Sequence, residues 1–472
     1  MNSIISIALI TLYIYTIITT ISILLLENRN PSKSISWVLL LLFVPVIGLI
    51  FYLIFGQNFR KQKIIAQKFY RTSEQYPLPS LNAIDTALLD HKQINLVRLL
   101  NKNSDAQTCI NNKIEILSDG KSTFDAIFED IRNAKEHIHI EFFIFGNDKI
   151  SNELRLLLIE KAKQGVRVRM IYDYWGSFFL SRWYLRTLRE AGVFIRPFLP
   201  FKLRFGRSKI NYRNHRKILI VDGKIGFTGG LNVADRYLFG NALGMWRDTF
   251  VRFEGSVVHS LQHLFLFDWY FVEQKLITDA KYFPIPHTYK NNMVQIVHSG
   301  PDTDWESIMQ GIATAIMSAT KYIYIHTPYF IPNEVVNNCI QMAALSGVDV
   351  RLMIPSRSDS RLSDLCTWSY LGQIMEAGVK VYQYKRGFLH SKAIVIDDFI
   401  SIVGSANLDE RSFNQNFEVN AFIYELETAQ HLKRLFARDM KYSTRLTLSA
   451  WNNRKRSQKL KESFARLFSP LM

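Results

Sequence analysis

The sequence predicts an α/β protein in which two similar lobes form one catalytic unit, preceded by two transmembrane helices. Three observations predict this class. The two halves of the chain repeat one pattern, each half alternates apolar β-branched runs with amphipathic segments, and the N-terminus carries two long uncharged runs. The expected parts are a membrane hairpin at 1–58, a juxtamembrane connector at 59–105, and lobes at 106–285 and 286–472.

The N-terminal runs lie at about 3–26 and 37–55. The first is long enough for a hydrocarbon core of about 30 Å, and it lacks the basic start and small-residue cleavage site of a signal peptide. Pro45 and Gly48 interrupt the second run, so a re-entrant or kinked hairpin is the alternative. More basic residues follow the second run than lie between the two runs, which predicts that the rest of the chain lies on the cytoplasmic side of the membrane.

Composition indicates the kind of partner. A net charge of +17 over 472 residues favours an anionic partner, either a lipid surface or nucleic acid, and the membrane runs favour lipid. The three cysteines, Cys109, Cys339 and Cys366, lie far apart and lack metal-ligand spacing. A disulfide framework is therefore not expected.

The internal repeat extends over most of residues 106–472. Each half reads helix, strand, helix, strand, helix, strand and then a hairpin, which is typical of an α/β lobe with buried strands. The matching segments are 134–143 and 319–328, 165–171 and 347–353, and 190–193 and 376–379.

The hairpins carry the chemistry. His215 and Lys217 stand two residues apart at the start of a β-branched run, and His390 and Lys392 repeat the arrangement. Because side chains alternate along a strand, each imidazole and its ammonium point to the same face. Two such pairs supply two imidazoles, one of which can act as a nucleophile and the other as an acid.

Other residues repeat with the pairs. Asp222 and Asp397 fall at odd offsets from their histidines, so we expect them to face away and to act structurally, the first in an Asp-Gly hairpin turn. Each motif is followed by a corner of small residues that ends in Asn and lets the backbone approach a ligand. These corners contain Gly230 and Asn232, and Ser405 and Asn407.

The duplicated pattern resembles the phospholipase D superfamily with its paired His-Lys-Asp motifs, and residues 30–56 resemble the N-terminal hairpin of bacterial cardiolipin synthases. The resemblance implies two pseudo-twofold-related α/β/α lobes that share one cleft. It implies phosphatidyl transfer from one phosphatidylglycerol to another, giving cardiolipin and glycerol through a phosphatidyl-histidine. The catalytic motif residues are then His215, Lys217, Asp222, His390, Lys392 and Asp397.

Within this chemistry the histidine of the first motif is the nucleophile and His390 the acid, an assignment taken from the resemblance. Asp248 and Glu418, in comparable positions after the two motifs, are predicted to hold the distal ring nitrogens of the histidines. Asn232 and Asn407 are predicted to stabilise the charged transition state, with Gly230 and Ser405 supporting the phosphate. No metal or other cofactor is expected, because no metal-ligand motif or phosphate-binding glycine loop occurs.

Two further segments are candidates for lipid contact. The loop at 198–207 alternates aromatic and basic residues just before the first motif. The basic segment at 436–472 reads either as a terminal helix packed on its own lobe, which we prefer, or as an amphipathic helix on anionic lipid.

Three alternatives remain open at this point: a hydrolytic phospholipase D, a nuclease of the same superfamily, and an inactive membrane scaffold. The same residues serve transfer and hydrolysis, so only products distinguish those two. The membrane runs count against nucleic acid as the partner, and two intact motifs count against the scaffold. The sequence predicts no oligomeric state.

Overall fold

The computed structural model describes residues 2–26, 31–44, 48–49, 52, 91–200, 211–290 and 292–472. The chain forms two compact units, one of residues 1–62 with 201–212 and one of residues 63–200 with 213–472. The predicted interfacial loop at 198–207 lies largely outside the described residues.

The N-terminal unit contains helices α1 (Asn2–Leu26) and α2 (Pro31–Phe43). Leu41 is buried in a small apolar cluster with Ile21 and Trp37, so the two helices pack together. Of the helices in the described residues, none is both long and apolar enough to cross a membrane, which differs from the spans predicted at 3–26 and 37–55. The second run does not form one continuous helix, because α2 ends at Phe43, two residues before Pro45.

The first lobe is built on a seven-stranded sheet of order β2-β10-β8-β7-β3-β4-β5. Strands β3, β4 and β5 are parallel, and β7 and β8 form an antiparallel hairpin beside β3. The bounds are β2 (Lys113–Leu117), β3 (His137–Phe142), β4 (Arg167–Asp173), β5 (Phe194–Phe198), β7 (Ile218–Val221), β8 (Ile225–Gly229) and β10 (Phe250–Glu254).

The second lobe repeats this plan in a larger sheet of order β1-β11-β20-β18-β17-β12-β14-β15-β21. The hairpin β17–β18 again lies beside the first strand of a parallel set, β12. The bounds are β1 (Thr108–Ile110), β11 (Met293–Ser299), β12 (Tyr322–His326), β14 (Asp349–Pro355), β15 (Lys380–Tyr384), β17 (Ala393–Ile396), β18 (Ile400–Gly404), β20 (Asn416–Tyr424) and β21 (Ser443–Arg445).

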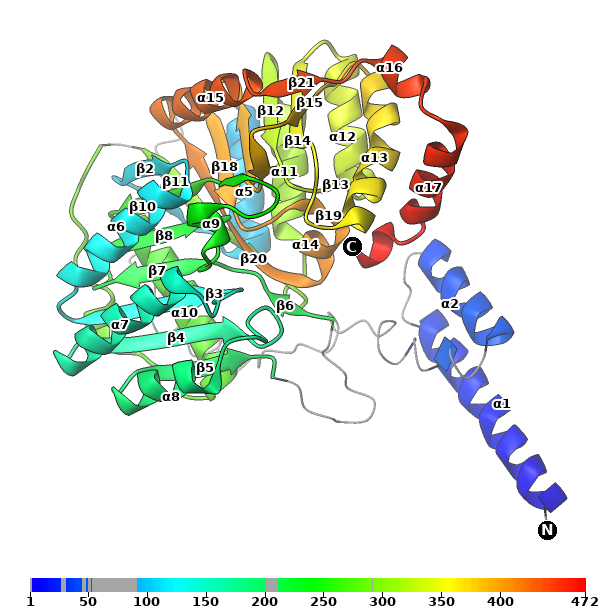
Figure 1. Cartoon of the computed structure of the whole chain (residues 1–472), viewed down its shortest axis with the longest axis horizontal. Helices are drawn as coiled ribbons and strands as arrows, with labels where there is room; N and C mark the ends of the chain where they lie inside the picture. Colours follow the sequence, from blue (N-terminus) through cyan, green and yellow to red (C-terminus); the bar gives the residue numbers. More distant parts are fainter. Residues whose placement is uncertain are drawn as a thin grey trace. The chain divides into compact units, whose positions relative to one another are not determined.

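Helices cover both faces of each sheet, so each lobe has the predicted α/β/α layers (Figure 1). One face of the first sheet carries α6 (Gly120–Asn133), α7 (Lys149–Lys163) and α8 (Arg182–Glu190), and the other carries α10 (Val257–Glu273). The second sheet lies between α15 (Leu426–Met440) and the group α11 (Ser307–Ser318), α12 (Glu334–Leu345) and α13 (Arg361–Glu376). The core side chains of α6 recur at helical spacing and are buried against the sheet.

The start of the described catalytic unit differs from the expected boundary at residue 106. Helix α5 (His91–Ser104) buries Leu96 and Leu100 in the core of the second lobe, and β1 pairs with β11 of the second sheet. Helix α5, expected in the connector, and strand β1, expected in the first lobe, therefore both belong to the second lobe. The cause is the open edge of β11, which accepts β1 irrespective of chain order.

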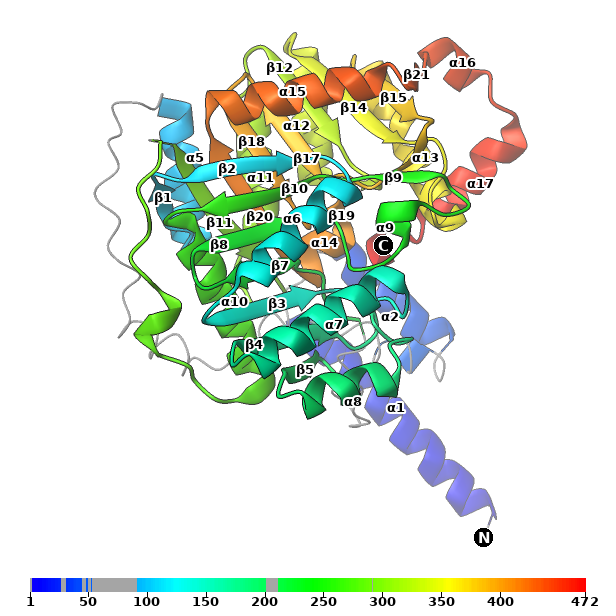
Figure 2. The same ribbon diagram turned by 60° about the vertical axis from the view of Figure 1, so that its left-hand side comes forward.

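The two lobes exchange short strands. β6 (Arg213–Asn214) of the first lobe pairs in parallel with the start of β20, and β16 (Gly387–Leu389) of the second lobe pairs in parallel with β9 (Met245–Arg247) of the first. Figure 2 shows β9 extending from the first lobe toward the second. The lobes are thus joined by backbone hydrogen bonds at two places.

The C-terminal segment follows the preferred prediction of a packed helix. After α16 (Leu448–Asn452), helix α17 (Arg456–Arg466) packs on α13, where Ala465 is buried and its carbonyl lies 3.0 Å from the Cys366 sulfur. The chain then ends in η5 (Ser469–Leu471) beside α14 (Glu410–Asn414) in both views (Figures 1 and 2).

Candidate active site

The two motif histidines stand where the exchanged strands end. His215 follows β6, and its N–H donates to the carbonyl of Phe417 in β20 at 2.9 Å. His390 follows β16, and its N–H donates to the carbonyl of Arg247 in β9 at 2.7 Å. Each histidine is therefore positioned by the backbone of the opposite lobe.

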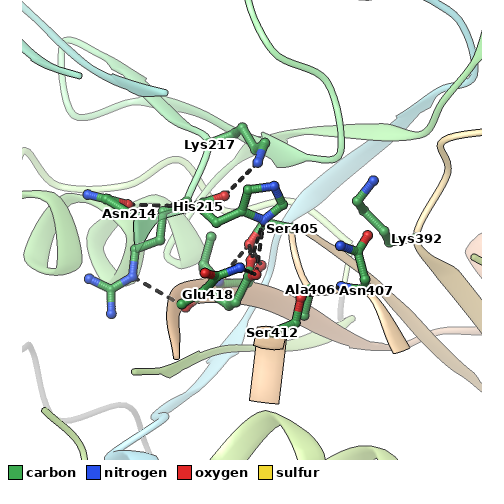
Figure 3. Close-up of polar contacts among 12 residues, drawn as sticks. Asn214, His215, Lys217, Lys392, Ser405, Ala406, Asn407, Ser412 and Glu418 are labelled. Carbon is green, nitrogen blue, oxygen red and sulfur yellow. Dashed lines mark hydrogen bonds and ion pairs between the residues drawn. The ribbon is translucent and has the colours of Figure 1, made fainter. Parts of the chain in front are cut away.

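The orienting carboxylates also come from the opposite lobe. Glu418 of the second lobe accepts from Nδ1 of His215 with both carboxylate oxygens at 2.9 Å (Figure 3). Asp248 of the first lobe lies 2.6 Å from Nδ1 of His390. Sequence reasoning identified both carboxylates but not the exchange between lobes. A carboxylate on Nδ1 leaves Nε2 as the ring nitrogen for chemistry. Nε2 of His390 lies 3.1 Å from the Lys392 ammonium.

Burial sets the protonation of these pairs. It lowers the pKa of His215 to about 4, and it lowers that of His390 well below its ordinary value, helped by the nearby Lys392 ammonium. Glu418 is also buried, but the positive charge and hydrogen bond of His215 hold its pKa down at about 2. Burial raises the pKa of Asp248 to about 6 against the pull of Lys392. At neutral pH each ring is a neutral imidazole whose Nδ1–H donates to an ionised carboxylate.

Each motif lysine contacts the backbone of the histidine two residues before it. Each ammonium donates at 2.6 Å to the backbone carbonyl of its own histidine, Lys392 to His390 and Lys217 to His215, and Figure 3 shows the second of these contacts. Both lysines are buried, which lowers the pKa of Lys217 to about 7 and that of Lys392 to about 8. They place positive charge in a poorly solvated region, where it acts strongly on a nearby anion.

Ser405 and Gly230 of the small-residue corners lie against the two orienting carboxylates. The Ser405 hydroxyl donates to Glu418 at 2.5 Å. Gly230 occupies the matching place in the first lobe, where an added Cβ would lie 2.1 Å from an oxygen of Asp248. Glycine is needed there because the carboxylate fills the space that a side chain would take.

The corner asparagines differ from each other. Both line the cavity described below, but Asn232 accepts from the N–H of Ile144 and donates to the Tyr237 hydroxyl, so its amide is engaged in the structure. The Oδ1 atom of Asn407 is buried without a hydrogen-bond partner among the described residues.

The motif aspartates lie away from the cavity, in left-handed turns at the far ends of β7 and β17. Asp222 (φ 54°) accepts the backbone N–H groups of residues 135, 136 and 137. Asp397 (φ 52°) accepts those of residues 320, 321 and 322. The resemblance placed both aspartates among the catalytic residues, and the structure corrects this. They tie each hairpin turn to the start of β3 or β12, which agrees with the structural role expected from the strand period.

Both histidines line one cavity of about 380 Å³ between the lobes. Sequence reasoning missed three arginines that also line it, Arg213, Arg236 and Arg411. The repeat contains a signal for two of them, because Arg236 follows Asn232 at the same distance as Arg411 follows Asn407. Within the described part of the chain, no group of three His, Cys, Asp or Glu residues is arranged to hold a metal ion.

Comparison with known proteins agrees with this geometry. The family model described as "Cardiolipin synthase, PLD-like domain" matches residues 127–247 and 312–440. A cardiolipin synthase of Halalkalibacterium halodurans is 41% identical over 95% of this chain and 91% of its own length. The chain belongs to the cardiolipin synthase family of the phospholipase D superfamily. A major cardiolipin synthase of Bacillus subtilis (strain 168) is 39% identical over the full length of both chains.

Two further matches cover the N-terminus and the fold. Residues 12–57 match the family model described as "Phospholipase_D-nuclease N-terminal". The crystal structure of a phosphatidylserine synthase from Haemophilus influenzae Rd KW20 covers 80% of this chain and 100% of that chain, with a TM-score of 0.62 and 16% identity. This likeness shows that the two-lobed fold is shared.

Proposed function

We propose that this cardiolipin synthase family member transfers a phosphatidyl group from one phosphatidylglycerol to another and releases glycerol. The observation that carries the proposal is the cavity shared by His215 and His390, in which each ring is held by a carboxylate of the opposite lobe. The reaction exchanges one phosphodiester for another, so it needs no nucleotide. The pairs supply a nucleophile and an acid without any added group.

In the first half-reaction, Nε2 of neutral His215 attacks the phosphorus of the donor lipid. The bond from phosphorus to the glycerol oxygen breaks, and protonated His390 gives its proton to that oxygen. The products are a phosphatidyl-histidine and glycerol. Burial disfavours the protonated form of His390, but the negative charge of a bound phosphodiester raises its pKa again.

In the second half-reaction, a hydroxyl of the second phosphatidylglycerol replaces glycerol. Neutral His390 takes the proton of this hydroxyl, whose oxygen attacks phosphorus while the bond to His215 breaks. The products are cardiolipin and free His215. Lys217 and Lys392 stabilise the extra negative charge of both pentacoordinate states, a contribution of about 3 kcal/mol for one donor of this type.

The proposed partner is an anionic membrane. The loop after β4 exposes Trp175, Phe178 and Phe179, the last with 87% of its surface accessible, and Arg213 lies 5.6 Å from the Trp175 ring. Aromatic and cationic side chains together suit a lipid headgroup interface. The loop adjoins the cavity, because Phe143, which contacts the His215 ring, accepts from the Ser177 hydroxyl in the loop through its carbonyl. We further propose that the N-terminal apolar region holds the chain at the cytoplasmic side of the cell membrane.

The direct test is a product assay with purified protein, phosphatidylglycerol vesicles and mass analysis of the lipids. We expect cardiolipin and glycerol in equal amounts, and none from His215→Ala or His390→Ala. Phosphatidic acid as the main product would instead support the hydrolytic alternative. Acid quenching followed by peptide mapping tests the nucleophile, because an adduct on His390 would reverse the two roles.

A further inference from the structure

The cavity is lined by three arginines and two aspartates in addition to the two motif histidines. Arg236 lies at the start of α9 (Arg236–Phe239) and Arg411 in α14, while Asp359 and Asp409 carry the negative charges. The two arginines occupy matching places in the repeat, one in each lobe. Their surroundings, however, are different.

Arg236 lies on the His390 side of the cavity. Its guanidinium carbon is 5.2 Å from the ring centre of Trp246 and 5.5 Å from that of Tyr237. The same two rings pack against the His390 ring, with centroids 5.2 Å and 5.5 Å away. Its Nε atom is buried and has no hydrogen-bond partner among the described residues. A buried donor without an acceptor is unfavourable, so this group is suited to an incoming anion.

Arg411 lies on the opposite side, among carboxylates. Burial lowers its pKa, while the negative charges of Asp409, Asp173 and Glu418 oppose that change. Glu418 is the partner of His215, so Arg411 belongs to the nucleophile side of the proposed reaction. Arg411 is therefore compensated by three carboxylates, whereas Arg236 packs on aromatic rings and keeps a donor without a partner among the described residues. Asp359 also lines the cavity and acts on His390.

The proposed reaction places a second phosphate at the Arg236 end. Glycerol leaves on the side of the acid His390, and the acceptor hydroxyl must enter at the same place. A phosphatidylglycerol acceptor carries its own phosphodiester beyond its glycerol, and this group does not react. Water and free glycerol carry no such anion.

We propose that Arg236 binds the non-reacting phosphodiester of the acceptor lipid. This inference rests on the proposed function and on the assignment of His390 as the acid. Guanidinium suits the role because its planar N–H groups pair with two phosphate oxygens at once, and the Trp246 and Tyr237 rings hold it in place. Arg236 then favours a lipid acceptor over water at the second half-reaction.

The test compares Arg236→Gln with the matched variant Arg411→Gln. Both are assayed on phosphatidylglycerol in mixed micelles for cardiolipin, phosphatidic acid and the exchange of labelled glycerol into phosphatidylglycerol. For Arg236→Gln we expect the ratio of cardiolipin to phosphatidic acid to fall at least tenfold. We also expect cardiolipin formation to fall at least tenfold more than glycerol exchange, because glycerol has no phosphate to bind. Arg236→Lys should restore part of the ratio.

For Arg411→Gln we expect all three activities to fall in the same proportion. An unchanged product ratio in Arg236→Gln, or a lowered ratio confined to Arg411→Gln, would overturn the inference. Equal loss of cardiolipin formation and glycerol exchange in Arg236→Gln would also overturn it, since the arginine would then act on the reacting phosphate. Wild-type protein that forms no cardiolipin would contradict the proposed function itself. Thermal unfolding of each variant verifies that it folds.

Discussion

At the scale of single residues, the two histidine-carboxylate pairs are not equivalent. Glu418 accepts from His215, Ser405 and the Asn416 side chain, which together favour its ionised form. Asp248 accepts from His390 and the N–H of Thr249, and burial prevails in raising its pKa. The partner of His390 is therefore the more easily protonated of the two.

This difference predicts the pH dependence of kcat, which reports the enzyme–substrate complex, where the bound phosphodiester raises the pKa of the acid His390. Asp248 has a pKa of about 6 and is needed ionised, so activity should fall as pH drops through 6. Lys217 has a pKa of about 7 and is needed protonated, so activity should also fall as pH rises above 7. His215, with a pKa of about 4, stays neutral throughout this window. A bell-shaped profile with its maximum between pH 6 and 7 is expected.

Lys217→Arg checks the alkaline side of the profile. Arginine stays protonated, so the fall in activity should move up toward pH 8, where Lys392 loses its proton. If the fall in activity at high pH stays at the same pH in a folded, active variant, that fall is due to the titration of a group other than Lys217.

The crossed carboxylates give a second prediction. Glu418→Gln and Asp248→Asn should each lower kcat by about 10²–10⁴, because an amide can present the wrong ring tautomer to the histidine. KM should change little, since neither side chain is placed to contact the lipid. Steady-state kinetics on mixed micelles measure both constants. A loss that appeared only in KM would mean that these groups act in lipid binding.

At the scale of elements, the hairpin turns are held by their aspartates. Asp397→Ala leaves the three N–H groups at residues 320–322 without their acceptor, at a cost of about 3 kcal/mol for bonds of ordinary strength. We expect a lower Tm and an unchanged kcat for each folded molecule. Differential scanning calorimetry and active-site titration measure these quantities. A normal Tm combined with a large loss of kcat would return the aspartate to the catalytic group.

Strand periodicity explains what the sequence could predict at this scale. It placed each motif aspartate at the far end of its hairpin, away from its histidine. His215 and Lys217, like His390 and Lys392, precede the strands β7 and β17, so strand alternation is not what brings each lysine to its histidine. It could not predict that His215 pairs with Glu418, since their meeting depends on how the lobes pack. The same limit applies to β1, which pairs with β11 across a long stretch of chain. Arg236 and Arg411 could have been predicted from the sequence, because each lies four residues after the asparagine of its repeat.

At the scale of the whole molecule, every group of the proposed mechanism lies in the larger compact unit. Deleting residues 1–58 should leave that unit folded and active on mixed micelles, but weaken its activity on phosphatidylglycerol vesicles. Membrane tethering raises the local concentration of enzyme at its substrate, and the truncated protein lacks it. Residual activity on vesicles should fall with added salt, because screening weakens the attraction of basic residues to anionic lipid.

The comparison needs two substrate forms and a folding control. Full-length and truncated protein are assayed on micelles and on vesicles across a salt series, with circular dichroism of both. Equal losses on the two substrates by a folded truncated protein would show that the N-terminal residues help to build the active site.

The exchanged strands β6 and β16 have a consequence for how such a chain can change over generations. A recombinant gene that joins the first half of one relative to the second half of another brings His215 of one parent against Glu418 of the other, and His390 against Asp248. Both catalytic contacts become hybrid at a single crossover. We therefore expect that a change in one residue of either contact requires a compensating change in the other half of the chain.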